Sequence, residues 1–228
     1  MGGQQGMCDY NVDLVMCIDA TGSMAHIIDE VKANAITFHK KFRKAMDEAG
    51  KNVAELRVKV IAFRDYQYDA EPMVESAFFT LPAEADAFKS FVDSIEATGG
   101  GDAPENALEA IAKAIKSDWT TGGEKRRHAV LVFSDAPALA LGERAGYASY
   151  PSDIPTDIKE LSAWWEGTTQ CAGSFQATNG RLVAFVPNAA PWTDITSWNR
   201  YWPMFSAAGT GLSDVELQPA LDVLVGTF

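Results

Sequence analysis

Apolar runs with almost no polar alternation, separated by helical segments, constrain the fold of this chain more than any other feature. Residues 12–18 and 128–134 are such runs, and continuous apolar strands are typical of a parallel sheet that is buried on both faces. Residues 56–63, 76–81 and 181–186 predict three further strands. The sequence therefore predicts an α/β fold, with a doubly wound, mostly parallel β-sheet flanked by helices on both faces.

Between the strands, apolar residues recur at the spacing of a helix. Residues 28–45 place them three or four positions apart, which predicts a helix that ends near Gly50. Residues 82–97 predict a second helix with proline at its start. A third helix is expected to begin near Pro104.

The 228 residues fit one large domain. We expect a flexible N-terminal segment at residues 1–10 and a single domain over residues 11–228. The connection between the last two predicted strands is longer than one crossover helix needs, and residues 136–155 are rich in Pro, Gly, Ser and Tyr. Loops of this length in compact domains are commonly functional or disordered, so we expect a long loop there.

The C-terminal part of the chain is rich in tryptophan. Two interpretations are open: the rings bury the back of the sheet, or they form an exposed aromatic interaction face. Five of the six tryptophans lie in this part, namely Trp164, Trp165, Trp192, Trp198 and Trp202.

The charge balance excludes several classes of function. Nineteen Lys and Arg against 31 Asp and Glu give a formal net charge of −12. Such a surface repels phosphate backbones and anionic lipid, so we expect neither nucleic-acid nor membrane binding. The first residues lack a secretory signal pattern, and Cys8, Cys17 and Cys171 form neither a disulfide framework nor a zinc pattern. We expect a cytoplasmic protein.

Two of the predicted strands lead directly into an aspartate, Asp19 and Asp135. The carboxyl ends of neighbouring parallel strands share one edge of the sheet, where ligands bind. Thr21 and Ser23 add hydroxyls in the turn after the first strand, and Asp102 ends a glycine run just before a helix. Oxygen ligands without His or Cys suit Mg²⁺ or Mn²⁺ rather than zinc. The pattern predicts a divalent-metal site.

Each of these residues also has a purely structural interpretation. Asp19, Thr21 and Ser23 could cap the following helix, and Asp135 could be a turn residue. Their joint occurrence at predicted strand ends, together with Asp102, favours the metal site.

Three segments occur in the order of the von Willebrand factor A family: DATGSM at 19–24, GGGDAPENAL at 99–108 and VLVFSDA at 130–136. The chain resembles this family over about residues 10–190. The first segment is similar to the Asp-x-Ser-x-Ser of the family's metal-ion-dependent adhesion site.

The resemblance implies particular metal ligands. Asp19, Thr21 and Ser23 would come from the first loop, and Asp135 from the later strand. The family's second loop normally supplies a threonine. Here the helix-opening alignment places Asp102 at that position, with Thr98 as a displaced alternative.

The resemblance also implies a function, that of a metal-dependent protein-interaction module without catalysis. Such a module captures a protein partner through a carboxylate on the ion, although the extra charge of Asp102 would favour the metal over an acidic partner. The cytoplasmic members that the chain resembles act with protein kinases, phosphatases or ring ATPases, often in bacterial stress-response assemblies. We expect the loop at 136–155, with Tyr147 and Tyr150, to select the partner; alternatively, it folds back and covers the site.

One enzymatic alternative stays open. Asp19 followed by Thr-Gly resembles the nucleophile loop of haloacid dehalogenase-type phosphotransferases, in which Asp19 would accept a phosphoryl group with Mg²⁺ held by a later acid. That interpretation needs a lysine on the phosphate, paired acids in the last loop and a cap domain, and Asp135 stands alone. We expect no enzymatic activity.

Overall fold

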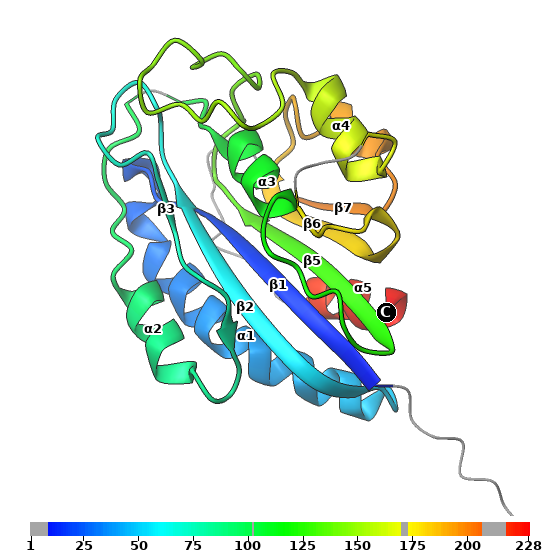
Figure 1. The fold of residues 1–228 in the computed structure, drawn as a ribbon. Coiled ribbons are helices and arrows are strands. Elements are labelled where there is room, and N and C mark those ends of the chain that lie inside the picture. Colours follow the sequence, from blue (N-terminus) through cyan, green and yellow to red (C-terminus); the bar gives the residue numbers. More distant parts are fainter. Residues whose placement is uncertain (1–8, 102, 170–172, 207–217) are drawn as a thin grey trace, which may run out of the picture.

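A computed structural model describes residues 9–101, 103–169, 173–206 and 218–228. Its centre is a seven-stranded sheet in the order β3-β2-β1-β5-β6-β7, with β4 also paired to β2 (Figure 1). Neighbours among the long strands run parallel, and the two short strands pair antiparallel with β2. The strands are β1 (Asp9–Asp19), β2 (Asn52–Phe63), β3 (Met73–Glu75), β4 (Phe79–Thr80), β5 (Lys125–Phe133), β6 (Gly180–Pro187) and β7 (Tyr201–Ser206).

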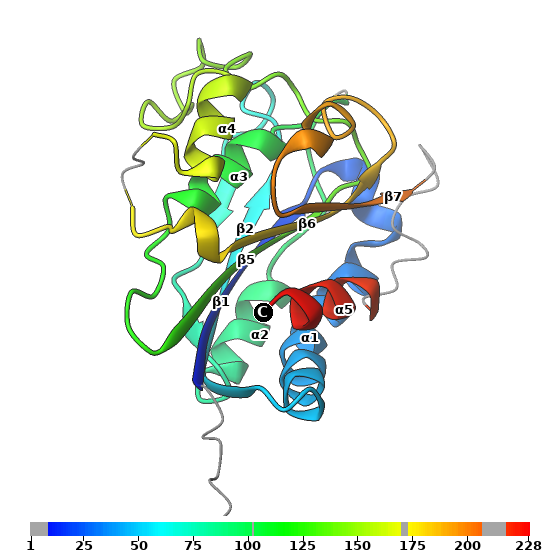
Figure 2. The ribbon, with the colours of Figure 1, turned by 90° about the vertical axis from the view of Figure 1, so that its right-hand side faces the viewer.

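Helices cover both faces of the sheet (Figure 2). One face packs against α1 (Ile28–Glu48), α2 (Ala85–Asp93) and α5 (Gln218–Thr227). The opposite face packs against α3 (Ala107–Ile115) and α4 (Ile158–Glu166). The predicted doubly wound, mostly parallel α/β fold is confirmed. Three 3₁₀ helices complete the elements: η1 (Gly22–His26), η2 (Ala177–Asn179) and η3 (Asp194–Ser197).

The central strand β1 shows why continuous apolar runs give two core layers. Leu14 and Met16 point to the layer of α1, whereas Val15 and Cys17 point to the layer of α3, and all four are fully buried. Alternate side chains of a strand point to opposite faces, so a strand covered on both sides must be apolar throughout.

Of the expected strand at 76–81, only Phe79–Thr80 forms a strand, β4, and a break at 76–78 separates it from β3 at Met73–Glu75. At the break, the Ser76 hydroxyl accepts the N–H of Val60 at 2.9 Å and donates to Ala77 O at 2.7 Å. A side-chain oxygen thus takes a position that a backbone carbonyl occupies in a continuous ladder. Ser76 favours a local hydrogen bond over the strand, which the apolar pattern alone does not reveal.

The tryptophans mostly bury the back of the sheet. Trp165 and Trp192 are fully buried in the layer of α3 and α4, and Trp164 and Trp198 are buried with them. Trp202 is half-buried and packs on the opposite layer. The burial interpretation is therefore confirmed for four of the five rings.

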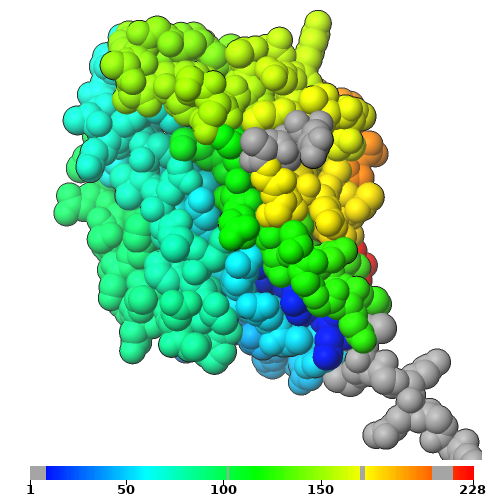
Figure 3. Space-filling model, viewed as in Figure 1, coloured from blue at the N-terminus to red at the C-terminus, as the bar shows by residue number. Residues whose placement is uncertain are grey.

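The long connection between β5 and β6 contains α4 and a compact segment before it. Residues 134–157, yellow-green in Figure 3, cover the upper end of the molecule in that view. Within the described ranges, no helix is long and apolar enough to span a bilayer.

Candidate metal site at the carboxyl edge of the sheet

The loop after β1, with Asp19, and the loop after β5, with Asp135, meet because β1 and β5 are parallel neighbours. Ile18 pairs with Phe133, so both strands end at the same level. Asp19 is the last residue of β1, and Asp135 follows two residues after the end of β5. The sheet therefore places both aspartates at one edge, as the strand pattern predicts.

A chain of close polar contacts links the predicted first-loop residues. Asp19 Oδ1 accepts from Thr21 N at 3.0 Å and from Thr21 Oγ1 at 2.7 Å. Thr21 Oγ1 lies 3.1 Å from Ser23 Oγ, which donates to Asp135 Oδ1 at 2.9 Å. The hydroxyls of Thr21 and Ser23 thus bridge the two carboxylates.

Ser134 is an additional member of this chain that the sequence pattern does not single out. Its Oγ donates to Asp19 Oδ2 at 2.6 Å, and Ala136 N donates to it at 3.2 Å. Both oxygens of Asp19 are therefore hydrogen-bonded, and the carboxylate is fixed in one orientation.

The Asp19 carboxyl is fully buried. Its pKa is raised from 3.8 to about 6, because burial, and to a smaller extent the charge of Asp135, outweigh the hydrogen bonds from Ser134 and Thr21 that lower it. A buried anion beside a second carboxylate is stabilised by a cation at the same place. Carboxylate and hydroxyl oxygens are the ligands that a hard divalent ion prefers, so this set fits Mg²⁺ or Mn²⁺.

The second-loop position is only partly described. Asp102 lies outside the described residues. Thr98 is exposed, and its backbone contacts the first loop through Thr98 N, which donates to Ala20 O at 2.9 Å. The choice between Asp102 and Thr98 as a ligand stays a prediction.

Glu105 is the site residue that the sequence analysis misses. Only 3% of it is exposed, and its Oε2 has no hydrogen-bond partner among the described residues. Burial raises its pKa to about 9, and the charges of nearby Asp19, Asp65, Asp69 and Asp135 act in the same direction. An orphaned buried carboxyl group in an acidic surrounding is a second feature that favours a cation here.

The backbone of Glu105 joins the second loop to the segment after β5. Its N–H donates to Pro137 O at 3.0 Å, and its carbonyl accepts from Leu139 N at 2.8 Å. In the sequence, the sign that could have pointed to Glu105 is that it is the second acid in the segment Asp102-Ala103-Pro104-Glu105. On sequence alone, that acid is indistinguishable from one that favours the first turn of a helix.

The connection after β2 adds two more carboxylates to this edge. Asp65 is fully buried and forms an ion pair with Arg144 at 3.2 Å. Asp69 Oδ2 accepts from Gly100 N at 2.9 Å and from Asp65 N at 3.2 Å. These contacts hold the glycine loop and the segment after β5 against the end of β2.

The predicted loop at 136–155 is anchored at its polar side chains. Tyr150 Oη donates to Glu109 Oε1 and accepts from Gly142 N, both at 3.0 Å, so this tyrosine serves the packing of the loop. Tyr147 is 40% exposed, and Tyr68 in the connection after β2 is 51% exposed. Together with Phe205 near the end of β7, these two rings are the exposed large hydrophobic side chains of the described residues.

In the described part of the chain, no three His, Cys, Asp or Glu side chains lie close enough to hold one metal ion. The hydroxyls of Thr21 and Ser23 are further oxygen atoms beside the two carboxylates. This is a hydroxyl-and-carboxylate site at the edge of a parallel sheet, on a fold typical of ligand-binding α/β domains.

Comparison with known proteins identifies the family. The profile described as von Willebrand factor A domain matches residues 13–141, which is more than half of the chain. The chain belongs to the von Willebrand factor A domain family. The match includes the three segments of the site, at residues 19–24, 99–108 and 130–136.

Among curated proteins, the chain is similar to the alpha-protein kinase vwkA of Dictyostelium discoideum. The two are 25% identical over 148 residues, which cover 65% of this chain and 22% of the kinase. The chain thus spans about a fifth of the length of this relative.

Two solved structures of one adhesin support the fold. The pilus adhesin SpaC from Lactobacillus rhamnosus GG superposes with a TM-score of 0.54 at 11% identity, covering 98% of this chain and 30% of the adhesin. Its open conformation gives a TM-score of 0.52 with the same coverage. A von Willebrand factor type A structure from Catenulispora acidiphila gives 0.46 at 16% identity, over 79% of this chain and 34% of that one. Membership of this family supports a protein-interaction module.

Proposed function

We propose that this domain is a metal-dependent protein-interaction module that binds Mg²⁺, or Mn²⁺, at the carboxyl edge of its sheet. The proposed ligands are Asp19, Thr21, Ser23 and Asp135, with Asp102 from the second loop. The main supporting observation is that the Thr21 hydroxyl donates to the buried Asp19, the Ser23 hydroxyl donates to Asp135, and the two hydroxyl oxygens lie 3.1 Å apart. When bound, the ion supplies an electrophilic centre for an oxygen ligand from a partner.

Glu105 belongs to the same proposal. Its carboxyl lies beside the glycine loop, because a Cβ placed on Gly100 would be 3.0 Å from Glu105 Oε1 and 2.6 Å from Thr21 Cβ. Glu105 and the first loop thus pack against the same glycine. A cation at this edge would favour the ionised form of Glu105, so this acid would tighten metal binding even without direct contact.

The partner is proposed to dock around the ion on the exposed rings of Tyr68 and Tyr147. Tyrosine offers a large contact area with few rotatable bonds, and it is enriched at interfaces. Of the two tyrosines expected in the loop at 136–155, Tyr147 keeps this role and Tyr150 has a structural one. The name of the Dictyostelium relative makes a protein-kinase assembly one proposed setting; phosphatase and ring-ATPase complexes, and a cytoplasmic location, stay predictions by resemblance.

The phosphotransferase alternative is not favoured. A phosphotransferase of that type would need a lysine poised on the phosphate and paired acids in the last loop, whereas Asp135 is followed by Ala136 and Pro137. The family match likewise favours binding over catalysis.

Calorimetric titration with Mg²⁺ tests the metal site. We expect one saturable site in the wild type and none in Asp19→Asn. The asparagine amide can donate to Ser134 Oγ while that hydroxyl donates to Ala136 O, so the variant is expected to fold. Asp29→Asn, an exposed aspartate of α1, is the control and should bind like wild type. Equal binding by Asp19→Asn and wild type would remove Asp19 from the site.

A further inference from the structure

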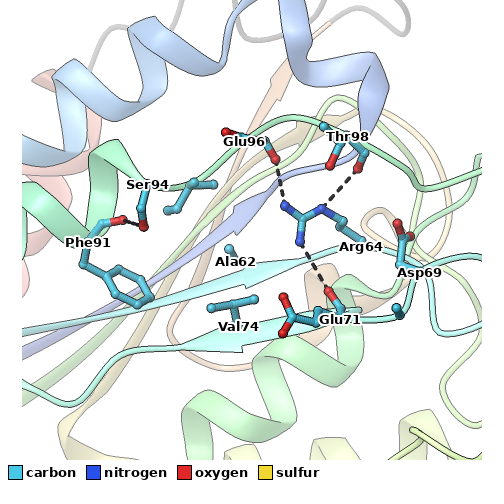
Figure 4. Close-up of a pocket in the computed structure, with 11 residues that line it drawn as sticks. Ala62, Arg64, Asp69, Glu71, Val74, Phe91, Ser94, Glu96 and Thr98 are labelled. Atoms are coloured by element: carbon cyan, nitrogen blue, oxygen red, sulfur yellow. Dashed lines mark hydrogen bonds between the residues drawn. The ribbon is translucent and has the colours of Figure 1, made fainter.

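Arg64 lies half-buried directly after β2, and its guanidinium contacts three separate segments; Figure 4 shows its contacts with Glu71, Glu96 and Thr98. Nε donates to Ala20 O and to Thr98 O, both at 3.1 Å. Nη2 donates to Glu96 O at 2.8 Å, and Nη1 donates to Glu71 O at 3.3 Å. One side chain therefore connects the first loop, the segment before the glycine loop and the β2–β3 connection.

The partners of Arg64 in these contacts are neutral backbone carbonyls. A charged donor makes stronger hydrogen bonds than a neutral one, and the planar guanidinium holds its acceptors in fixed directions. A lysine ammonium could replace the charge but not the fork, that is, the several N–H groups that the planar guanidinium holds in fixed directions. The arrangement is suited to fixing loops rather than to forming an ion pair.

The fixed carbonyls lie next to proposed metal ligands. Ala20 stands between Asp19 and Thr21, and Thr98 begins the turn into the glycine loop at 99–101. Two backbone hydrogen bonds join the same loops: Thr98 N donates to Ala20 O at 2.9 Å, and Gly22 N donates to Gly99 O at 3.0 Å. The shared Nε contact of Arg64 adds a third link between them.

We propose that Arg64 is the positioning residue of the metal edge, by which we mean the proposed metal site at the carboxyl edge of the sheet. It would hold the first loop and the glycine loop at the spacing that the ion requires. This inference rests on the proposed metal site. Arg64 contributes no ligand atom and acts through the backbone on both sides of Asp19 and through the start of the glycine loop. Supporting groups of this kind typically change metal affinity by about 10- to 100-fold.

The charge of Arg64 makes the proposal distinguishable from a purely electrostatic effect. A cation near a divalent-metal site repels the ion, so removing the charge alone would tighten metal binding. Removing the links between the loops would weaken it. Arg64→Met and Arg64→Lys separate the two effects, since methionine loses the charge and the fork, whereas lysine loses the fork alone.

A cavity of about 700 Å³ beside Arg64 gives a further test. Ala62, Val74, Phe91 and Ile95 form its apolar walls, and the guanidinium lies at the end that faces the loops (Figure 4). A cavity of this size leaves room for a small guanidinium compound to occupy the vacated place in Arg64→Ala. Methylguanidinium at millimolar concentration is therefore expected to restore metal affinity to that variant.

Arg43 is a matched control. It is also half-buried and also donates to two backbone carbonyls, Val53 O at 3.0 Å and Leu81 O at 2.9 Å, but it lies on α1 away from the metal edge. We expect Arg64→Met and Arg64→Lys to lower Mg²⁺ affinity by about 10- to 100-fold in calorimetry, and Arg43→Met to leave it unchanged. Tighter or equal binding by Arg64→Met would overturn the proposal, as would an equal loss in Arg43→Met.

Hydrogen exchange of the metal-free protein keeps the inference separate from the metal site. If Arg64 holds the loops, the amides of Gly22 and Thr98 should exchange faster in Arg64→Met than in wild type, and Arg43→Met should leave them protected. Unchanged protection in Arg64→Met would overturn the proposal even if wild type binds Mg²⁺. Wild type without Mg²⁺ binding, but with this loss of protection, would contradict the proposed function and leave the loop-holding role of Arg64 intact.

Discussion

Two buried carboxyl groups, Asp19 and Glu105, impose the main electrostatic cost of the metal edge. Both have raised pKa values, about 6 and about 9, because burial disfavours their charged forms. Asp19 receives hydrogen bonds at both oxygens, whereas Glu105 Oε2 has no partner among the described residues. Glu105 is therefore the group whose protonation should respond most strongly to the metal.

The raised pKa of Glu105 predicts how stability changes with pH. The folded protein keeps this proton up to about pH 9, whereas an unfolded glutamate loses it above its ordinary pKa of 4.5. Folding therefore takes up a proton in this window, and the free energy of unfolding falls as pH rises. The contribution of one such group is about 1.4 kcal/mol per pH unit.

Denaturant unfolding of the metal-free protein between about pH 6.5 and pH 8 measures this slope. We expect Glu105→Gln to be less sensitive to pH than wild type, and the exposed control Glu30→Gln to match wild type. Saturating Mg²⁺ should reduce the wild-type slope, since a nearby cation favours the ionised carboxylate. Identical slopes for wild type and Glu105→Gln would contradict the raised pKa.

At the scale of loops and strands, the glycine loop sets the distance between the first and second loops. Gly99, Gly100 and Gly101 all have positive φ angles, of 70°, 88° and 64°. At Gly100 the space is also closed, because an added Cβ would lie 2.6 Å from Thr21 Cβ. The absence of a side chain lets the two loops approach each other.

Gly100→Ala is expected to lower both stability and Mg²⁺ affinity, because its methyl group must push Thr21 away from Asp19. Gly50→Ala is the control: it has a similar positive φ of 69°, but nothing lies within 4 Å of the added Cβ. Gly50→Ala should cost about 1 kcal/mol of stability from backbone strain and leave metal affinity unchanged. Equal metal affinities of the two variants, measured by calorimetry, would show that the close approach at Gly100 is unimportant.

The elements that bring Asp19 and Asp135 together could be predicted from the sequence. Both aspartates follow long apolar runs, and the periodicity of such runs is a strong signal for buried parallel strands. The break in strand structure at 76–78 could not be predicted, because it depends on the local hydrogen bonds of Ser76. Short local bonds leave no periodic pattern.

The roles of residues that depend on contacts with distant parts of the chain could not be predicted from the sequence either. Glu105 becomes important because the fold buries it among four acids, and Tyr150 because it meets Glu109, 41 positions away in the chain. Arg64 makes carbonyl contacts to segments 32 to 44 residues away, in addition to the nearby Glu71. Composition and spacing identify such residues as polar but not as neighbours.

At the scale of the whole molecule, the net charge of −12 attracts cations to the entire surface. Divalent ions could therefore raise stability by a diffuse effect, without any specific site. The two contributions differ in their response to salt: a diffuse counterion effect is screened beyond about 8 Å at physiological ionic strength, whereas a site between buried carboxylates is screened much less.

Thermal unfolding with and without Mg²⁺, at low and at physiological ionic strength, separates them. A specific ion at 100 times its dissociation constant stabilises the fold by about 2.7 kcal/mol. In wild type, we expect most of the rise in Tm to persist when salt is added at a fixed ratio of Mg²⁺ to its dissociation constant. In Asp19→Asn, the rise should be small and should disappear with salt, since only the diffuse attraction remains. A rise in Tm that is equal in both proteins and is abolished by salt in both would assign the effect of Mg²⁺ to the acidic surface as a whole.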